Sequence, residues 1–191
     1  LERELCREHG GIQDQIAAAY GGLNRIDFSK DGFQVRPIEI SEDRLEKLNS
    51  NLLLFFSGQS RFSSEIAKEQ TSRTAENTET LHKMKELVSE GEKILCSDRS
   101  LDEFGELLGY SWKMKTTLAN NITNDEINTF YETALKNGAS GGKLLGAGGG
   151  GFILLYVPEK YQSKVKTALE KYMYVPFRFE NDGSRILYSK S

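Results

Sequence analysis

The sequence lacks the features that mark two common classes of protein. Of its 191 residues, 25 are lysine or arginine and 28 are aspartate or glutamate, so the formal net charge is −3. Proteins that bind nucleic acid through phosphate contacts normally have a basic surface, which this balance does not favour. No apolar run approaches the ~18 residues that a membrane-spanning helix needs. We therefore expect neither a nucleic-acid partner nor a membrane partner.

Cysteine and histidine are also scarce, with two residues of each. Cys6 and Cys96 stand far apart, as do His9 and His82, so neither pair has the spacing of a zinc site or a redox motif. Isolated thiols are typical of a reducing compartment, and no basic and apolar leader is visible. The expected location is therefore cytoplasmic.

Apolar residues make up 38% of the chain, and their spacing predicts both helices and strands. An Asp-Gly turn between the runs 24–28 and 33–40 predicts a β-hairpin. The other expected strands are 52–56, 152–157, 175–180 and 186–188, and the expected helices are 13–20, a pair within 61–96, 100–118, 124–136 and 159–172, with 41–50 as a connector or short helix. This order predicts an α+β fold, in which an antiparallel sheet carries helices on one face.

The first candidate for chemistry is Asp14, which follows Gly10 and Gly11 at the start of a helix rich in small residues. Backbone N–H groups at a helix start stabilise an ionised carboxylate. Such a carboxylate can accept the proton of a substrate hydroxyl. The alternative is that Asp14 only caps the helix, and the spacing alone leaves both interpretations open.

The second candidate is the glycine cluster at 146–151, which formally reads G-x-G-x-x-G. A dinucleotide-binding loop follows a strand and opens a helix, whereas this cluster precedes a strand, and no Lys-Ser or Lys-Thr of a Walker loop follows it. A flexible linker is the alternative. Glycine permits close backbone approach to a phosphate, and Lys143 could add a positive charge. Because valine rarely adopts a positive φ, Gly148→Val should damage activity if the loop is functional.

Arg61 lies in a polar turn that follows the expected strand 52–56. Loops at the ends of strands often contact ligands, so Arg61 could pair with a substrate phosphate. The alternative is an arginine that is simply solvated.

Three segments together resemble the GHMP kinase family, with the strongest similarity to its heptose 7-phosphate kinase branch. GGIQDQIAAAYGGLNRIDF at 10–28 resembles the central motif of that branch, KLLGAGGGGFILLYV at 143–157 resembles the third GHMP motif, and LLLFFSGQSRFSSEIAKEQ at 52–70 resembles the same subgroup. The resemblance implies ATP-dependent phosphorylation of a sugar or sugar phosphate, most specifically the anomeric hydroxyl of a heptose 7-phosphate. The alternatives are a galactose, fucose or mevalonate kinase, or a non-catalytic ferredoxin-like binding module.

The resemblance also implies an organisation and a set of residue roles. Residues 1–45 would end the N-terminal lobe, and residues 46–191 would form the ferredoxin-like C-terminal lobe. The implied cofactors are ATP and Mg²⁺. The implied roles are Asp14 as catalytic base, Glu2 as a Mg²⁺ ligand, Gly146, Ala147, Gly148, Gly149, Gly150 and Gly151 near the nucleotide phosphates, and Gln13, Arg61 and Lys143 as substrate contacts.

One expected part of the family pattern is missing from the chain. GHMP kinases bind the triphosphate with a loop of the form P-x-x-x-G-L-G-S-S-A, which does not occur here, and the chain starts at Leu1 without a methionine. We therefore expect a fragment that is inactive by itself. The expected partners are a small sugar or sugar phosphate, the N-terminal lobe of the same protein, and a second copy in a homodimer.

Overall fold

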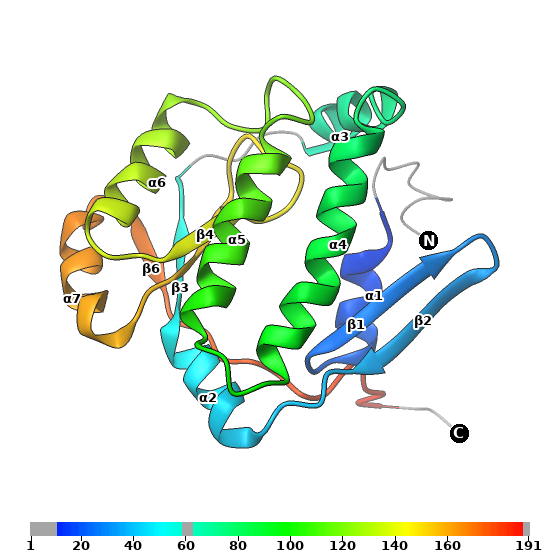
Figure 1. Cartoon of the computed structure of the whole chain (residues 1–191), viewed down its shortest axis with the longest axis horizontal. Helices are drawn as coiled ribbons and strands as arrows, with labels where there is room; N and C mark the ends of the chain where they lie inside the picture. Colours follow the sequence, from blue (N-terminus) through cyan, green and yellow to red (C-terminus); the bar gives the residue numbers. More distant parts are fainter. Residues whose placement is uncertain (1–10, 59–62, 189–191) are drawn as a thin grey trace.

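The computed structural model describes residues 11–58 and 63–188, and Figure 1 shows how their elements are arranged. The helices are α1 (Gln13–Tyr20), α2 (Glu42–Asn51), α3 (Ser63–Ser72), α4 (Thr78–Leu95), α5 (Asp102–Lys115), α6 (Asp125–Lys136) and α7 (Glu159–Ala168). The strands are β1 (Asn24–Ser29), β2 (Gly32–Pro37), β3 (Leu52–Phe56), β4 (Gly141–Leu144), β5 (Phe152–Tyr156) and β6 (Met173–Val175).

Strands β3 to β6 form one sheet in the order β4-β5-β3-β6, and every neighbouring pair is antiparallel. Helices α3 to α6 connect β3 to β4, and α7 connects β5 to β6. A strand, a helical crossover, two strands, a second helix and a last strand in this order make up a ferredoxin-like layer. The predicted α+β class is confirmed.

Helices cover both sides of this sheet, whereas the sequence analysis expected them on one side. Phe55 of β3 contacts Phe130 of α6, with ring centroids 5.6 Å apart. Tyr156 of β5 points to the other side, where a Cβ added to Gly105 of α5 would lie 2.6 Å from its ring. The strand 152–156 is apolar at successive positions, FILLY, which is typical of a strand that is buried on both faces.

The hairpin of β1 and β2 is attached to α4 through an ion-pair cluster at the edge of the molecule (Figure 1). Glu92 of α4 accepts hydrogen bonds from Arg25 of β1 at 2.8 Å and from Arg36 of β2 at 2.7 Å. Arg25 also pairs with Asp27 at 2.9 Å. A two-stranded hairpin is only marginally stable in isolation, so this cluster is expected to hold it in place.

Glu92→Gln should lower the melting temperature of the intact protein near neutral pH. Hydrogen bonds from Arg36 and Arg25 lower the pKa of Glu92 to about 2, from an ordinary value of 4.5. A depressed pKa contributes stability above the unfolded value, and that contribution is lost as the pH falls toward the folded value. The difference between the variant and the native protein should therefore shrink as the pH falls from about 4.5 towards about 2, measured by thermal unfolding in a pH series.

The matched control is Glu79→Gln, because Glu79 lies on the same helix and pairs with Lys83 at the exposed surface. Exposed pairs of this kind contribute little stability. An equal loss in the two variants at neutral pH would contradict the anchoring role of Glu92.

The end of α1 and the glycines that follow it, Gly21 and Gly22, lie close to the C-terminal segment. The N–H of Gly22 donates to the carbonyl of Glu180 at 2.9 Å, and the N–H of Ser184 donates to the carbonyl of Ala19 at 3.1 Å. Gly21 has φ 65°, and a Cβ there would lie 2.4 Å from the backbone of Asp182. Glycine at this position therefore permits α1 to end against the C-terminal segment.

Some predicted elements differ from those observed. The strand β4 was not predicted, and the segment from 176 to 188 contains no strand, so only Val175 of the predicted strand 175–180 belongs to one. Helix α7 ends at Ala168 rather than at 172. The division expected between residues 45 and 46 falls inside α2, and we propose that it lies before Ser41, whose side chain caps this helix.

No helix within residues 11–58 and 63–188 is both long enough and apolar enough to cross a membrane.

Candidate functional site

Asp14 lies in the first turn of α1 with an exposed side chain. The N-cap of this helix is Ile12, and no side chain caps it with a hydrogen bond. The alternative that Asp14 serves only as a cap is therefore wrong. Its neighbour Gln13 is also exposed and folds back over Gly11, since a Cβ on Gly11 would lie 1.9 Å from Oε1 of Gln13.

The glycine cluster forms the loop between β4 and β5, and it is held in place by hydrogen bonds. Gln70 donates to the carbonyl of Ala147 at 2.8 Å, and the N–H of Gly149 donates to the carbonyl of Ile122 at 2.9 Å. At the end of the loop, Gly151 exchanges hydrogen bonds with Ser57 at 2.8 and 3.0 Å. These contacts come from three separate parts of the chain, so the loop is not a flexible linker.

Positive φ angles give this loop its shape. They occur at Gly146, Gly148, Gly149, Gly150 and Gly151, with values from 74° to 157°. Side chains other than hydrogen rarely permit such angles, so the shape of the loop depends on glycine at these positions.

Several N–H groups of the loop are available to a ligand. The N–H groups of Gly146, Ala147, Gly148 and Gly150 have no acceptor among the residues that the structure describes. Buried N–H groups normally have partners, and Gly148 is buried. The loop is therefore equipped to donate to an anionic group such as phosphate.

Lys115, the last residue of α5, connects this loop to Asp14. Its ammonium donates to the carbonyl of Gly146. The pKa of Lys115 is lowered to about 8, mainly by burial and also by the charge of Lys143, while the charge of Asp14 opposes the shift. Electrostatic coupling of this kind acts over short distances in salt solution. Asp14, the two lysines and the start of the glycine loop therefore lie in one region.

Lys143 projects from β4 opposite Leu154 of β5 and is partly buried. Burial lowers the pKa of its ammonium. The structure thus brings together Asp14 and the glycine loop with Lys143, which were two separate candidates in the sequence. Glu2 and Arg61 lie outside the described residues.

Lys115 is not among the site residues predicted from the sequence. Its only signal in the sequence is its place in the Lys-Met-Lys run that ends an amphipathic helix, and basic residues are favoured at helix ends for reasons unrelated to ligands. Only the fold shows that this lysine reaches a loop that follows it by 31 residues.

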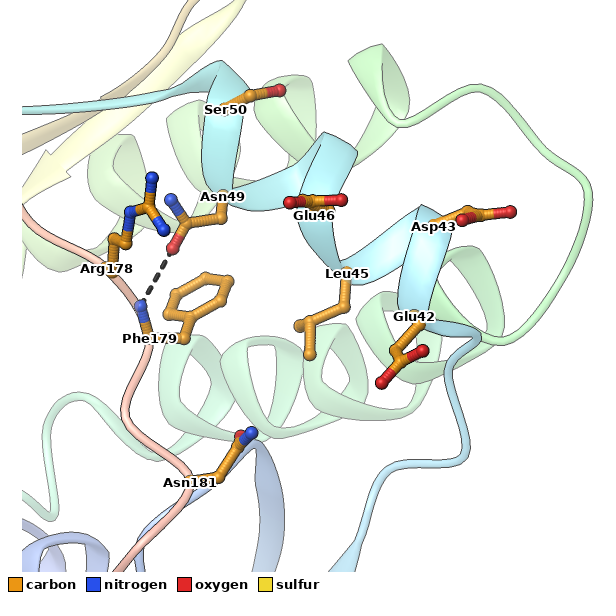
Figure 2. Close-up of a pocket in the computed structure, with 9 residues that line it drawn as sticks. All are labelled: Glu42, Asp43, Leu45, Glu46, Asn49, Ser50, Arg178, Phe179 and Asn181. Atoms are coloured by element: carbon orange, nitrogen blue, oxygen red, sulfur yellow. Dashed lines mark hydrogen bonds between the residues drawn. The ribbon is translucent and has the colours of Figure 1, made fainter.

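A separate pocket of about 540 Å³ lies between α2 and the C-terminal segment, as Figure 2 shows. Asn49 forms one side of it and accepts a hydrogen bond from the N–H of Phe179 at 2.8 Å. Glu42, Asp43 and Glu46 line the pocket on α2, with Arg178 opposite. None of the residues selected from the sequence lines it, and its three carboxylates do not suit a phosphate compound. We therefore place the candidate site at the glycine loop.

Comparison with known proteins shows similarity to GHMP kinases. Residues 84–175 match the family model for the C-terminal domain of GHMP kinases. The chain is 30% identical over 189 residues to the D-glycero-alpha-D-manno-heptose 7-phosphate kinase of Campylobacter jejuni, covering 96% of this chain and 55% of that protein.

Solved structures show the same similarity. The crystal structure of a D-glycero-D-manno-heptose 1-phosphate kinase from Bacteroides thetaiotaomicron matches with a TM-score of 0.68 and 28% identity, covering 98% of this chain and 53% of that one. A mevalonate kinase matches in fold, with a TM-score of 0.71, 20% identity and coverage of 95% and 54%. The chain thus spans about half the length of these relatives. The resemblance expected from the sequence is confirmed by the match of residues 84–175 to the family model for the GHMP kinase C-terminal domain.

Proposed function

We propose that the intact protein transfers a phosphoryl group from ATP to a hydroxyl of a sugar or sugar phosphate. The observation that carries this proposal is the convergence of Asp14, the glycine loop and two lysines in one region. A carboxylate beside phosphate-binding donors is the arrangement that phosphoryl transfer needs, because the protein contributes mainly positioning and charge stabilisation.

In the proposed reaction, the substrate hydroxyl oxygen forms a bond to the terminal phosphorus of ATP. The bond from that phosphorus to the bridging oxygen breaks, and ADP leaves with the electron pair. Asp14 accepts the proton of the hydroxyl as general base. The free N–H groups of the loop donate to the phosphate oxygens on which negative charge accumulates. Asp14 is exposed, so a substrate can reach it.

The described residues are compatible with Mg²⁺ bound mainly by phosphates. Among them, no three His, Cys, Asp or Glu side chains are close enough to hold a metal ion. Mg²⁺ commonly takes one or two carboxylates and completes its coordination with phosphates and water. We propose Glu2 as the carboxylate that would hold the ion, which leaves Asp14 free to act as the base. The ion would supply charge neutralisation to the bound phosphates.

The substrate that we propose is a heptose 7-phosphate, phosphorylated at its anomeric hydroxyl. The support is the similarity over nearly the whole chain to kinases whose names specify a heptose phosphate. Gln13, next to Asp14, and Arg61 are the further side chains that we propose as substrate contacts.

The test is a substrate panel with the intact protein, ATP and Mg²⁺, in which ADP release is measured. We expect kcat/KM for a heptose 7-phosphate to exceed that for galactose, fucose and mevalonate by at least about a hundredfold, since a site built for a polar group strongly rejects compounds that lack it. A higher value for another sugar would contradict the proposed substrate. Ligand binding without any ADP release would support a non-catalytic module.

A further inference from the structure

Two partly buried lysines lie beside the glycine loop: the ammonium of Lys115 donates to the carbonyl of Gly146, and Lys143 lies in the strand that leads into the loop. Lys115 comes from the end of α5 and Lys143 from β4, and each is partly buried. The charge of Lys143 disfavours the charged form of Lys115. Like charges held close together in a region of low dielectric repel each other more strongly than they do in water.

Within the described part of the chain, neither Lys115 nor Lys143 forms an ion pair with a carboxylate. Among these residues, Asp14 of α1 is the carboxylate whose charge acts on Lys115. Lys143 therefore repels Lys115 and Asp14 attracts it, so two ammonium groups face one carboxylate among the described residues.

Lys115 also has hydrogen-bonding capacity to spare. An ammonium group has three N–H donors, and one of them goes to the carbonyl of Gly146. That bond fixes the ammonium at the first residue of the loop, next to the free N–H groups of Gly146 and Ala147. Two donors remain for a ligand that binds at the loop.

We propose that Lys115 is a phosphate-binding residue, which holds with Lys143 a phosphate dianion that lies against the glycine loop. The inference rests on the proposed kinase function and extends it to a residue outside the family motifs quoted above. The phosphate is either the terminal group of the nucleotide or the phosphate monoester of the sugar. Both present the same chemistry to the two ammonium groups.

The proposed role predicts that Lys115 takes up protons when phosphate binds. Because Lys115 has a pKa of about 8 without ligand, about half of the molecules carry it uncharged near pH 8. A phosphate dianion favours the charged form. Binding near pH 8 should therefore take up roughly half a proton at Lys115.

The first test measures affinity by isothermal titration calorimetry with the intact protein and its variant Lys115→Met. The probes are ADP, a non-hydrolysable ATP analogue, and a sugar with and without its phosphate. We expect a loss of about tenfold to a hundredfold for whichever probe supplies the phosphate, the size typical of a hydrogen bond to a charged group. The matched control is Lys113→Met, which removes an exposed lysine from the same helical turn and should change no affinity.

The probes distinguish the two sources of phosphate. A loss confined to the ATP analogue, with ADP unaffected, identifies the terminal phosphoryl group. A loss confined to the sugar phosphate, with the unphosphorylated sugar unaffected, identifies the substrate's own phosphate. Unchanged affinity for all four probes would overturn the inference, and persisting ADP release in that variant would leave the proposed function standing. Failure of the native protein to bind any phosphate probe would overturn both.

The second test measures proton uptake by repeating the titrations near pH 8 in buffers of different ionisation enthalpy. Lys115→Arg keeps the positive charge but remains protonated at every accessible pH. We expect about half a proton less uptake in Lys115→Arg and in Lys115→Met than in the native protein. If Lys115→Met fails to fold, the test can still be made with Lys115→Arg, which keeps the positive charge. Equal uptake in the native protein and Lys115→Arg would show that Lys115 does not change its charge on binding, and would contradict the proposal.

Discussion

Asp14→Asn should lower the turnover number of the intact protein by about a hundredfold or more. An asparagine has nearly the same shape but cannot accept the proton of the substrate hydroxyl, and general bases typically contribute a factor of this size. Substrate affinity should change much less, because the side chain remains able to form a hydrogen bond. The measurement is kcat and KM for ADP release with Mg²⁺-ATP and the best substrate of the panel.

The stability of the Asp14→Asn variant serves as the internal control. Asp14 is exposed in the first turn of α1 and does not cap the helix, so the variant should lose no more than about 1 kcal/mol from the helix dipole. The matched substitution is Asp31→Asn, in the exposed turn between β1 and β2, which should leave turnover unchanged. Unchanged turnover in Asp14→Asn would assign the base to another residue.

The same variant reports on the coupling between α1 and the glycine loop. Because the charge of Asp14 raises the pKa of Lys115, removing that charge should lower the pKa. The pH at which Lys115 loses its proton should therefore move down in Asp14→Asn, which links the proposed base to the proposed phosphate site by one measurable group.

Periodicity and turn chemistry were sufficient to predict most elements of the fold. Asn124 is the N-cap of α6, and its side chain accepts from the N–H of Ile127 at 2.9 Å, as a polar residue before an apolar stripe predicts. The hairpin follows from the Asp-Gly turn at 31–32. These signals are local, so a single sequence contains them.

The elements that were missed depend on contacts between distant segments. The strand β4 contains two glycines, which disfavour a strand in isolation. A Cβ on its Gly141 would lie 2.0 Å from the carbonyl oxygen of Gly105 in α5. Glycine is therefore required there by the approach of a helix 36 residues earlier in the chain, which the pattern of a single strand does not reveal. For the segment 175–180 the error is the opposite one, a strand that was predicted but not formed. Its alternation predicts a strand, but Phe177 and Phe179 pack against a cluster around Leu48.

The candidate site divides in the same way. Asp14 and the glycine loop could be selected from the sequence because glycines and an acidic residue form recognisable patterns. Lys115 could not, because one lysine at the end of a helix is common and its function depends on what α5 lies against. The Arg25–Glu92 contact, which joins residues 67 positions apart, is another example.

In the glycine loop, the cost of a strained backbone angle can be measured separately from the cost of a steric clash. Gly148 has φ 135°, and a Cβ there would lie 2.8 Å from Cα of Ile122. Even the small change Gly148→Ala therefore adds a strained backbone angle and a clash with backbone atoms. Effects of these two kinds typically cost about 1–3 kcal/mol each. We expect Gly148→Ala to lower the free energy of unfolding by about 2–6 kcal/mol and Gly148→Val by at least as much.

Gly151→Ala is the matched comparison for this prediction. Gly151 has φ 107°, so alanine is strained there as well, but among the described residues other than its two chain neighbours no heavy atom lies within 4 Å of an added Cβ. This variant should lose only the conformational part, about 1–3 kcal/mol. Both losses can be measured by urea unfolding of the intact protein.

Because the N–H of Gly149 donates to the carbonyl of Ile122, displacement of Gly148 should also move the N–H donors that we propose for the phosphate. Turnover in Gly148→Ala should therefore fall further than in Gly151→Ala under conditions in which both variants are folded. Equal stability and equal turnover in the two variants would show that the contact with Ile122 does not position the loop.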